Sequence, residues 1–553
     1  MNDDTNNMNN TNDTNDTNDT NDTNDTNDMD DLLSEYLDQE EQIKTDDTTD
    51  AQSSNDGTDD YYAKTQEYYK KMSFYDMFSA VYFTLHSGYI CCAEYLKYKT
   101  GWKSKTNSII DVSKRLANIN MMYVKIFQAF ATNRNILSPE LTQFFNDYTD
   151  NVKYTNDEYD DNDLLELEHK AMDCYPYKPI QILNDRKPIK SGLMSLIFKG
   201  RFIDATATAT ATATADDADA DDDNASQYVA IKYLRNNIIT NFNTSMNNLV
   251  VFAKLTKYIP YIRTLNIETL ILQNIVCLKD QVCFSKEVTN IQQYYKSWKD
   301  CDYVKIPEPY SDFTDKVNPN IIVMEFINGR KITEIEPEDN DKFGIILASF
   351  NAKAAFCNSI FHGDLHPGNI LFIKEELPST TAATTAATTA ATAVYKIGIL
   401  DFGIIGHLTR TDQELLFKSA KLLYQKKYKR MIDVILNEMS EVLNLNHDSP
   451  TTTIPNKLAD DVFLKIHREL HAVIIDYSTP EIKFIGVNEL YTINYILNSY
   501  NLTFKRSMYR LFITIAIMDS IATKLGNEMS YMQHMTDVVI DLFGIDPGNF
   551  ADD

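Results

Sequence analysis

The stretches that decide the fold of this chain are Phe361-His-Gly-Asp-Leu-His-Pro-Gly-Asn369 and Leu400-Asp-Phe-Gly403. The first places Asp364 and Asn369 at the D-x-x-x-x-N spacing of a phosphoryl-transfer loop. The second is an Asp-Phe-Gly tripeptide that follows an apolar run, Val394-Tyr-Lys-Ile-Gly-Ile-Leu400, which predicts a strand. Each stretch alone is a weak signal. The two in this order predict a site for nucleotide phosphates.

The chemistry of phosphoryl transfer explains why these residue types occur together. The reaction needs oxygen ligands that hold magnesium on the phosphates, and a carboxylate that orients or deprotonates the acceptor. Asp401 and Asn369 suit the metal, and Asp364 suits the acceptor. His362 and His366 are expected to brace the loop rather than to perform chemistry. The predicted cofactors are therefore ATP and Mg²⁺.

The remaining parts of such a site are expected earlier in the chain. The segment Tyr228-Val-Ala-Ile-Lys232 predicts a strand that ends in a phosphate-binding lysine. Glu287 stands on a stretch with helical periodicity and is the candidate partner of this lysine, with a solvated surface Glu as the competing interpretation. A buried strand followed by a turn is predicted in residues 320–329, so backbone groups near Glu325 and Phe326 would meet the adenine.

These motifs resemble those of the UbiB/aarF family of atypical kinase-like proteins, which is associated with ubiquinone biosynthesis. The family loop His-x-Asp-x-His-Pro-Gly-Asn is matched at every fixed position by the first stretch quoted above. A second family motif, Lys-x-Gly-Gln in a helical extension, is resembled by residues 123–130, in which Lys125 and Gln128 are retained. The resemblance covers roughly residues 115–530. It implies an α+β, protein-kinase-like two-lobed fold, with Lys125 and Gln128 near the nucleotide.

The chain departs from the family at three places. Phe127 replaces the glycine of Lys-x-Gly-Gln. The Ala-rich nucleotide loop of the family appears here as Pro188-Ile-Lys-Ser-Gly-Leu-Met-Ser195, in which Gly192 is the candidate nucleotide contact. A family Glu-x-Asp pair aligns with Gln281 and Cys283. The metal and phosphate residues are thus intact, while the positions that the resemblance connects with regulation are altered.

Three other classes of function compete with this interpretation. Small-molecule kinases of the aminoglycoside and choline type share the His-Gly-Asp loop but lack the helical extension. Ordinary protein kinases carry His-Arg-Asp and Ala-Pro-Glu motifs that this sequence lacks, so a small or lipid-associated acceptor is expected rather than a peptide. A nucleotide-binding scaffold with little turnover is the alternative from another class, and the altered family positions favour it.

The sequence predicts four regions and two low-complexity insertions. Both insertions are expected at hairpin tips, where added length costs little loop-closure entropy. The regions are a disordered acidic Asn/Asp/Thr-rich tail (1–60), a helical N-terminal extension (61–180), a kinase-like N-lobe (181–328, insertion 204–224) and a kinase-like C-lobe (329–547, insertion 378–393).

Charge and cysteine content narrow the partners and the compartment. The formal net charge of the chain is −28, but residues 1–60 hold 20 acidic residues against one Lys, and Asp216 to Asp223 add six more acidic residues. About −3 remains for the rest of the chain, so the body is nearly neutral. It has no basic stripe of the kind that nucleic-acid binding requires. The seven cysteines form no Cys-x-x-Cys pair, which fits an intracellular reducing compartment. The N-terminus resembles neither a mitochondrial nor a secretory targeting signal.

The relation of the chain to membranes stays open at this stage. Its most apolar run, Leu511 to Met518, is too short to span a bilayer and is expected to be a buried helix. The helices predicted between Tyr61 and Asp173 are rich in Tyr and Phe. Peripheral membrane contact through these helices is therefore an expectation.

Overall fold

The structure is a computed structural model, and most of the predicted body of the chain is described in it. The predicted acidic tail and nearly all of both insertions lie outside the described residues. The structure describes residues 74–124, 127, 140–141, 144–145, 152–174, 180–203, 228–236, 238–256, 281–376, 393–442, 460–474, 487–525 and 531–542.

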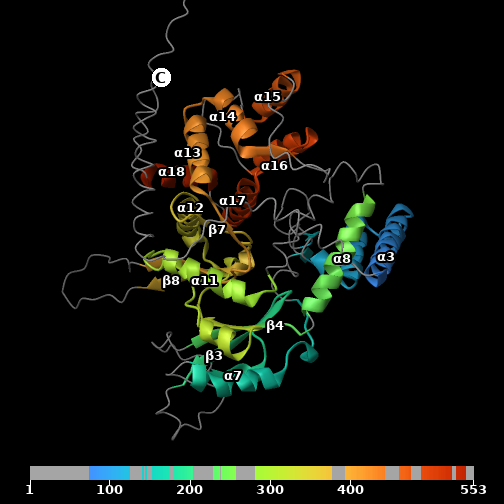
Figure 1. The fold of residues 1–553 in the computed structure, drawn as a ribbon, viewed down its shortest axis with the longest axis vertical. Coiled ribbons are helices and arrows are strands. Elements are labelled where there is room, and N and C mark those ends of the chain that lie inside the picture. Colours follow the sequence, from blue (N-terminus) through green and yellow to red (C-terminus); the bar gives the residue numbers. More distant parts are fainter. Residues whose placement is uncertain are drawn as a thin grey trace, which may run out of the picture.

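A five-stranded antiparallel sheet occupies one end of the main body of the molecule (Figure 1). The strands follow the order β1-β3-β4-β6, and β2 pairs with the first residues of β3. Their bounds are β1 (Ile180–Ile182), β2 (Lys190–Ser191), β3 (Ser195–Phe202), β4 (Tyr228–Leu234) and β6 (Ile321–Glu325). The predicted strands before Lys232 and around residue 320 are therefore confirmed as β4 and β6.

The central strand β4 is apolar on both faces, because both faces of the sheet are covered. Val229, Ile231 and Tyr233 belong to a core cluster with residues of α7 (Asp161–Cys174). The alternating residues point to the opposite face, where the side chains of α11 (Phe284–Trp298) and the candidate site lie. This alternation with period two places Lys232 on the face that is directed at the site.

Helices form the other end of the body, around α12 (Asn340–Phe356), which is buried along most of its length. Two short strands beside it, β7 (Ile360–His362) and β10 (Ile405–His407), pair antiparallel. The surrounding helices are α13 (Arg410–Tyr424), α14 (Tyr428–Val434), α15 (Asp460–Ile474), α16 (Val487–Ser499), α17 (Arg506–Lys524) and α18 (Tyr531–Leu542).

Residues 490–525 do not form one continuous helix, because a strand interrupts them. Asn501 has a φ of 58°, a left-handed conformation that ends the helical path after α16. The next residues form β12 (Leu502–Phe504), which pairs with β11 (Ser440–Val442). Helix resumes in α17, where Leu511, Thr514 and Met518 are buried as expected for a helix of the interior.

A three-stranded sheet carries the segments on either side of the second insertion. It contains β5 (Val304–Lys305), β8 (Ile370–Glu376) and β9 (Ala393–Ile399) in the order β5-β9-β8. β8 and β9 are antiparallel, with Glu376 opposite Ala393, and the first insertion likewise joins the antiparallel pair β3 and β4. Both insertions thus connect hairpin neighbours, as predicted.

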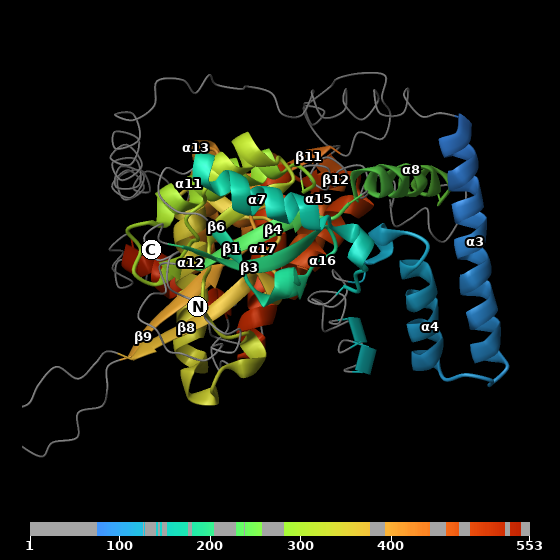
Figure 2. The same ribbon diagram turned by 90° about the horizontal axis from the view of Figure 1, so that it is seen from below.

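Three helices stand to one side of the body. Figure 2 shows α3 (Phe74–Lys99) at the outer edge, beside α4 (Lys105–Ala117) and the end of α8 (Ile238–Thr256). The buried face of α3, including Phe83 and Ile90, belongs to the main core cluster, which also contains Phe242 and Met246 of α8. Among the described helices, none combines the length and the apolar character needed to cross a bilayer.

Candidate functional site

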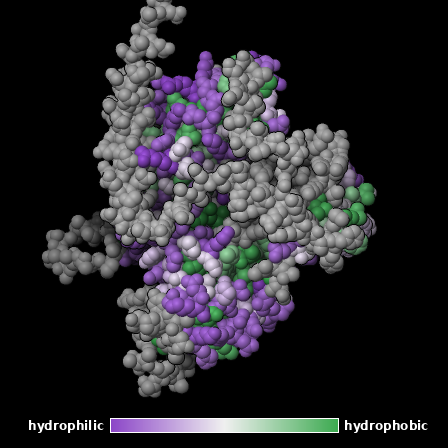
Figure 3. Space-filling view, viewed as in Figure 1, coloured by the Kyte–Doolittle hydropathy of each residue, from purple (hydrophilic) through white to green (hydrophobic). Residues whose placement is uncertain are grey.

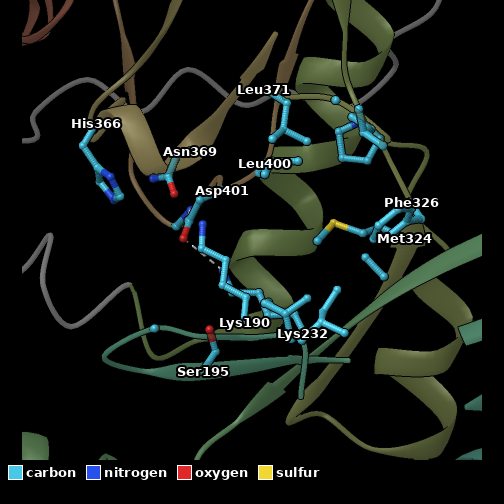
Figure 4. Close-up of a pocket in the computed structure, with 18 of the residues that line it drawn as sticks. Lys190, Ser195, Lys232, Met324, Phe326, His366, Asn369, Leu371, Leu400 and Asp401 are labelled. Atoms are coloured by element: carbon cyan, nitrogen blue, oxygen red, sulfur yellow. Dashed lines mark hydrogen bonds and ion pairs between the residues drawn. The ribbon is translucent and has the colours of Figure 1, made fainter. Parts of the chain in front are cut away.

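A cavity of about 360 Å³ lies between the five-stranded sheet and the helical end of the body (Figure 4). Most of the residues predicted from the sequence line it, although they come from segments far apart in the chain. The predicted lining residues that the cavity contains are Gly192, Lys232, Glu325, Phe326, Asp364, Asn369 and Asp401. Lys125 and Gln128 lie outside the described residues, so their predicted nucleotide contacts stay a prediction.

Lys232 joins two carboxylates at the inner wall of this cavity. Its Nζ forms an ion pair with Oε1 of Glu287, and lies 3.3 Å from Oδ2 of Asp401. Lys232 is 6% exposed and Glu287 1% exposed, so the alternative of a solvated surface Glu at 287 is wrong. Glu287 does not line the cavity itself, but fixes the lysine from behind, from the first turn of α11.

The charge states of this cluster follow from its burial. Burial alone would lower the pKa of Lys232, but the negative charges of Asp401 and Glu287 outweigh it and raise this pKa well above the usual value. Burial raises the pKa of Glu287, and the Lys232 ammonium opposes that shift. Glu287 Oε2 is buried without a hydrogen-bond partner among the described residues. The lysine is therefore firmly protonated and has two carboxylates that compete for it.

The hairpin β8–β9 explains why Asn369 and Asp401 meet although an insertion separates them. Its register sets Ile370 opposite Ile399, so the residues just before β8 and just after β9 are neighbours. The backbone N–H of Leu400 donates to the Asn369 carbonyl at 3.0 Å, which closes the hairpin at its base. The two predicted metal ligands thus stand at one end of one pair of strands.

The oxygen atoms at this end of the hairpin suit magnesium. Asn369 Nδ2 donates to the Asp364 carbonyl at 3.1 Å, which leaves the side-chain oxygen of Asn369 as the ligand atom. The Asp401 side chain is 40% exposed, so its carboxylate is open to the cavity. Within the described part of the chain, no three His, Cys, Asp or Glu side chains form a metal cluster. A cation held here would take few protein oxygens and complete its shell with phosphates and water, as magnesium does in nucleotide sites.

His362 holds the loop at residues 361–369 to the Asp-Phe-Gly turn. One ring nitrogen, Nδ1, accepts from the Asp364 N–H at 3.1 Å, and Nε2 bonds to the Asp401 carbonyl. The buried hydroxyl of Thr514 donates to the His362 carbonyl at 2.8 Å, which ties the loop to α17. His366 Nδ1 accepts from the Gly368 N–H at 3.2 Å. Both histidines therefore bond to the backbone of the loop, as the bracing role predicts.

Helix α11 also fixes the Asp-Phe-Gly turn through its backbone. Asn290 Nδ2 donates to the Phe402 carbonyl at 2.8 Å, and the Phe402 N–H points to Glu287 Oε1 at 3.4 Å. The Phe402 ring is fully buried, 5.2 Å from the ring of Tyr294. The helix that positions Lys232 through Glu287 therefore positions Asp401 as well.

The strand end at Glu325 and Phe326 differs from the expectation in one respect. The Glu325 N–H donates to the Glu308 carbonyl at 2.8 Å, and the Phe326 N–H donates to the Tyr228 carbonyl at 3.0 Å. Both amides are thus already bonded, although both residues line the cavity. The next backbone N–H, that of Ile327, makes no hydrogen bond within the described residues. Backbone groups of successive residues in an antiparallel strand point alternately toward and away from the paired strand, so the Glu325 carbonyl points away from β4. An adenine would therefore meet the Glu325 carbonyl and the Ile327 amide.

The nucleotide loop also differs from the expectation, because the Gly192 N–H is bonded to the Ser195 carbonyl at 2.9 Å. An added Cβ at Gly192 would meet nothing closer than that carbonyl, at 3.4 Å. A residue that the sequence did not single out, the buried Arg235, donates to the Gly192 carbonyl and to Ser191 Oγ, each at 2.6 Å. It also pairs with Glu158. The sequence signal for this contact is a charged residue, Arg235, directly after an apolar strand.

The altered family positions lie at the site or support it. Gln281 Nε2 is 3.4 Å from Asp364 Oδ2, and Gln281 Oε1 is buried without a partner among the described residues. Cys283 is the residue before the first turn of α11, and its side chain makes no capping hydrogen bond. Phe127 is buried, with its ring 6.2 Å from that of Tyr123 and 5.2 Å from that of Phe145.

Comparison with known proteins gives a matching family model, similar curated proteins and similar solved structures. Residues 206–435 match the ABC1 atypical kinase-like domain. A protein described as probable protein kinase UbiB from Photobacterium profundum is 25% identical over 212 residues, 37% of this chain and 36% of that protein. The corresponding protein of Cronobacter sakazakii is 26% identical over 212 residues, again 37% and 36%.

The matched region thus spans 36% of the length of these curated relatives. A solved structure, the complex of Rv3197 with erythromycin from Mycobacterium tuberculosis, has 14% sequence identity and a TM-score of 0.37, and the likeness covers 72% of this chain and 90% of that chain. The family match includes Lys232, Asp364, Asn369 and Asp401. The chain is therefore similar to the UbiB family of atypical kinase-like proteins, and residues 206–435 match the ABC1 atypical kinase-like domain.

Proposed function

We propose that this protein binds ATP with magnesium in the cavity and either hydrolyses ATP or transfers its terminal phosphoryl group to a small or lipid-associated acceptor. The observation that supports this most is the Lys232–Glu287–Asp401 cluster, because it borders the same cavity as Asp364 and Asn369. Such a cluster has no use in packing, since buried charges are costly unless a function or close pairing maintains them.

Each residue of the site has a role in this proposal. Lys232 binds phosphate oxygens, and Glu287 keeps the lysine in place. Asp401 and Asn369 would hold magnesium, which neutralises negative charge on the phosphates. Asp364 takes the proton of the acceptor hydroxyl or of water, as that oxygen bonds to the terminal phosphorus and the bond to the leaving ADP oxygen breaks.

The proposal also includes the lobe boundaries predicted from the sequence. Residues 181–328 and 329–547 would act as an N-lobe and a C-lobe, with the nucleotide between them and the extension at 61–180 packed beside them. The placement of the cavity between the sheet and the helical end supports this arrangement. A small or lipid-associated acceptor is favoured over a peptide, because α13 begins at Arg410, soon after Gly403, and leaves little chain for a peptide platform.

Nucleotide binding is tested by thermal unfolding of the full chain. ATP or ADP with magnesium should raise the melting temperature of the parent, because a ligand that binds only the folded state stabilises it. Asp401→Asn should lose the magnesium-dependent part of this rise. A parent whose melting temperature does not respond to nucleotide would refute the proposal.

A nucleotide-binding protein with little turnover is the second candidate, and one contact favours it. Gln281, at a position where the family has Glu, places an amide donor 3.4 Å from the carboxylate that would act as base. Steady-state ATP turnover separates the two candidates. For an enzyme, Asp364→Asn should lower turnover by about 10²- to 10⁴-fold, the range for loss of a general base, with nucleotide binding retained. Equal turnover in parent and variant would reject Asp364 as the base.

A lipid surface is the proposed location of the acceptor, and α3 supports it. Large apolar side chains of α3 are exposed at helical spacing, at Phe78, Tyr82, Leu85, Tyr89 and Leu96. In the space-filling view, hydrophobic residues gather on the side of the molecule where α3 lies (Figure 3). An exposed apolar stripe of this size marks an interaction surface, and a membrane interface is one surface that such a stripe can contact.

A further inference from the structure

Lys190 lines the cavity, and neither the sequence motifs nor the proposed roles above use it. It stands on β2, directly before the turn of the nucleotide loop. Its Nζ donates to the backbone carbonyl of Gly368 at 2.7 Å, so it reaches across the cavity to the catalytic loop. Figure 4 shows its side chain extending from the sheet toward Asn369 and Asp401.

The backbone around Lys190 is held firmly, so its direction is set by the fold. The N–H of Ile189 donates to the Ile197 carbonyl at 2.7 Å. Ser191 Oγ donates to the Val152 carbonyl at 2.5 Å and accepts from the guanidinium of Arg235 at 2.6 Å. The residues on both sides of Lys190 are thus anchored, and its ammonium group is the part of this strand that enters the cavity.

The rest of the loop offers less to a phosphate than a glycine-rich loop usually does. Glycine-rich loops contact phosphates through backbone amides, but the Gly192 N–H is already bonded to the Ser195 carbonyl. The positive charge of Lys190 is therefore the strongest phosphate-binding group that this loop directs into the cavity.

The position of the ammonium group identifies which phosphate it would contact. Lys232 marks the inner wall beside α11, whereas Asp364 and Asn369 mark the place where the terminal phosphoryl group would be transferred. Lys190 lies against Gly368, the residue before Asn369. The Gly368 carbonyl is a neutral acceptor of this ammonium group, and a phosphate oxygen would form a stronger, charge-assisted hydrogen bond than that carbonyl does.

We propose that Lys190 binds the terminal phosphate of a nucleoside triphosphate and thereby makes the site prefer triphosphate over diphosphate. This inference rests on the proposed nucleotide binding and adds a second lysine, from the nucleotide loop, to the phosphate contacts. Lys190 is then a binding residue whose ammonium group turns from the Gly368 carbonyl to the terminal phosphate when a triphosphate binds.

Calorimetric titration of the full chain tests this, with ADP and a non-hydrolysable ATP analogue, each with magnesium. Lys190→Met keeps the aliphatic stem and removes the charge. Loss of one charged hydrogen bond should weaken binding of the triphosphate analogue by about 10- to 100-fold, and binding of ADP by less than about threefold. Lys187→Ala is the matched control, because it removes a lysine of the same segment that does not line the cavity, and it should change neither affinity.

The outcomes separate this inference from the function on which it rests. If the parent binds neither nucleotide, both the proposed function and the role of Lys190 are refuted. If the parent binds both nucleotides and Lys190→Met weakens them equally, or tightens them, the role in terminal-phosphate binding alone is refuted. Lys190→Arg keeps the charge and should retain most of the preference for the triphosphate. Loss of the triphosphate preference in Lys190→Arg would also count against a contact that depends on charge.

Discussion

His362 is the residue through which the catalytic loop and the Asp-Phe-Gly turn are connected. Its two ring nitrogens bond to the backbone at Asp364 and at Asp401, so the neutral ring with its proton on Nε2 satisfies both partners. A second proton would bind at Nδ1 of the ring, where it would face the Asp364 N–H, so that two donors would oppose each other. Burial accordingly lowers the pKa of His362 below its usual value, against the smaller opposing effect of the Asp401 carbonyl.

This lowered pKa predicts a loss of stability in mild acid. The unfolded chain binds the proton near pH 6.5, whereas the folded protein binds it only at lower pH. The contribution of His362 is therefore fully present above roughly pH 6.5 and is lost as the pH falls toward the folded-state pKa, by at most about 1.4 kcal/mol per pH unit.

Urea unfolding between pH 7.5 and pH 5, roughly the window set by the ordinary histidine pKa, measures the effect. His362→Gln retains an amide donor for the Asp401 carbonyl but has no titrating group, so its free energy of unfolding should fall less steeply than that of the parent. His407, whose pKa burial also lowers, is present in both proteins and cancels in the comparison. Equal slopes in parent and variant would show that His362 does not titrate in this range.

The sequence identified the charged residues of the site better than it identified the backbone groups. Lys232, Asp364 and Asp401 could be recognised because each lies in a motif whose spacing is set by chemistry. The occupied amides of Gly192 and Phe326 could not, because their partners belong to other strands and the pairing register is a property of the folded sheet.

At the scale of elements, helix α11 fixes more of the site than any single residue does, because it holds both Lys232 and the Asp-Phe-Gly turn. The N-terminus of this helix is weakly capped. Cys283 has the extended backbone of an N-cap residue, but its side chain accepts no hydrogen bond from the first turn. Ser, Thr, Asp or Asn at this position would satisfy one of the N–H groups that a helix start leaves unbonded. The helix positions both Glu287 and the backbone of Phe402, so its first turn affects two parts of the site.

Cys283→Ser is therefore expected to stabilise the protein. A new cap should add about 1 kcal/mol to the free energy of unfolding, which chemical denaturation would measure. Cys283→Ala is the matched control, since it removes the thiol and provides no acceptor, and it should not share the gain. If both variants have the same stability, the start of α11 is not limited by its cap.

The elements that the sequence predicted and those it missed differ in where their stabilising contacts come from. β4, α11 and β9 carry their pattern within themselves, as an apolar alternation or a helical repeat. β12 does not, because Leu502 to Phe504 are only three residues between two helices, and their strand conformation depends on pairing with β11 from a distant part of the chain. Local pattern therefore predicts helix there, and tertiary pairing overrides it.

At the scale of the whole molecule, the exposed face of α3 is the feature that the kinase-like body does not explain. Leu85 is 69% exposed and Trp102, at the turn after the helix, is 82% exposed. From Phe78 to Lys99 the single acidic residue is Glu94, which is buried and paired with Lys97, among others. Between Phe78 and Lys99, the exposed side of α3 thus combines large apolar and aromatic side chains with lysines and has no exposed carboxylate, which suits the headgroup region of a lipid bilayer.

The full chain is therefore expected to co-sediment with phosphatidylcholine–phosphatidylglycerol vesicles through α3. Leu85→Glu combined with Tyr89→Glu should reduce the bound fraction at least about tenfold, because burying each large apolar side chain contributes roughly 1.5–3 kcal/mol. Leu464→Glu, on α15, is the matched control, since it alters an equally exposed Leu on another helix and should leave vesicle binding unchanged. Binding that survives the α3 substitutions, or a parent that forms a dimer through α3 in the absence of vesicles, would assign this face to a different partner.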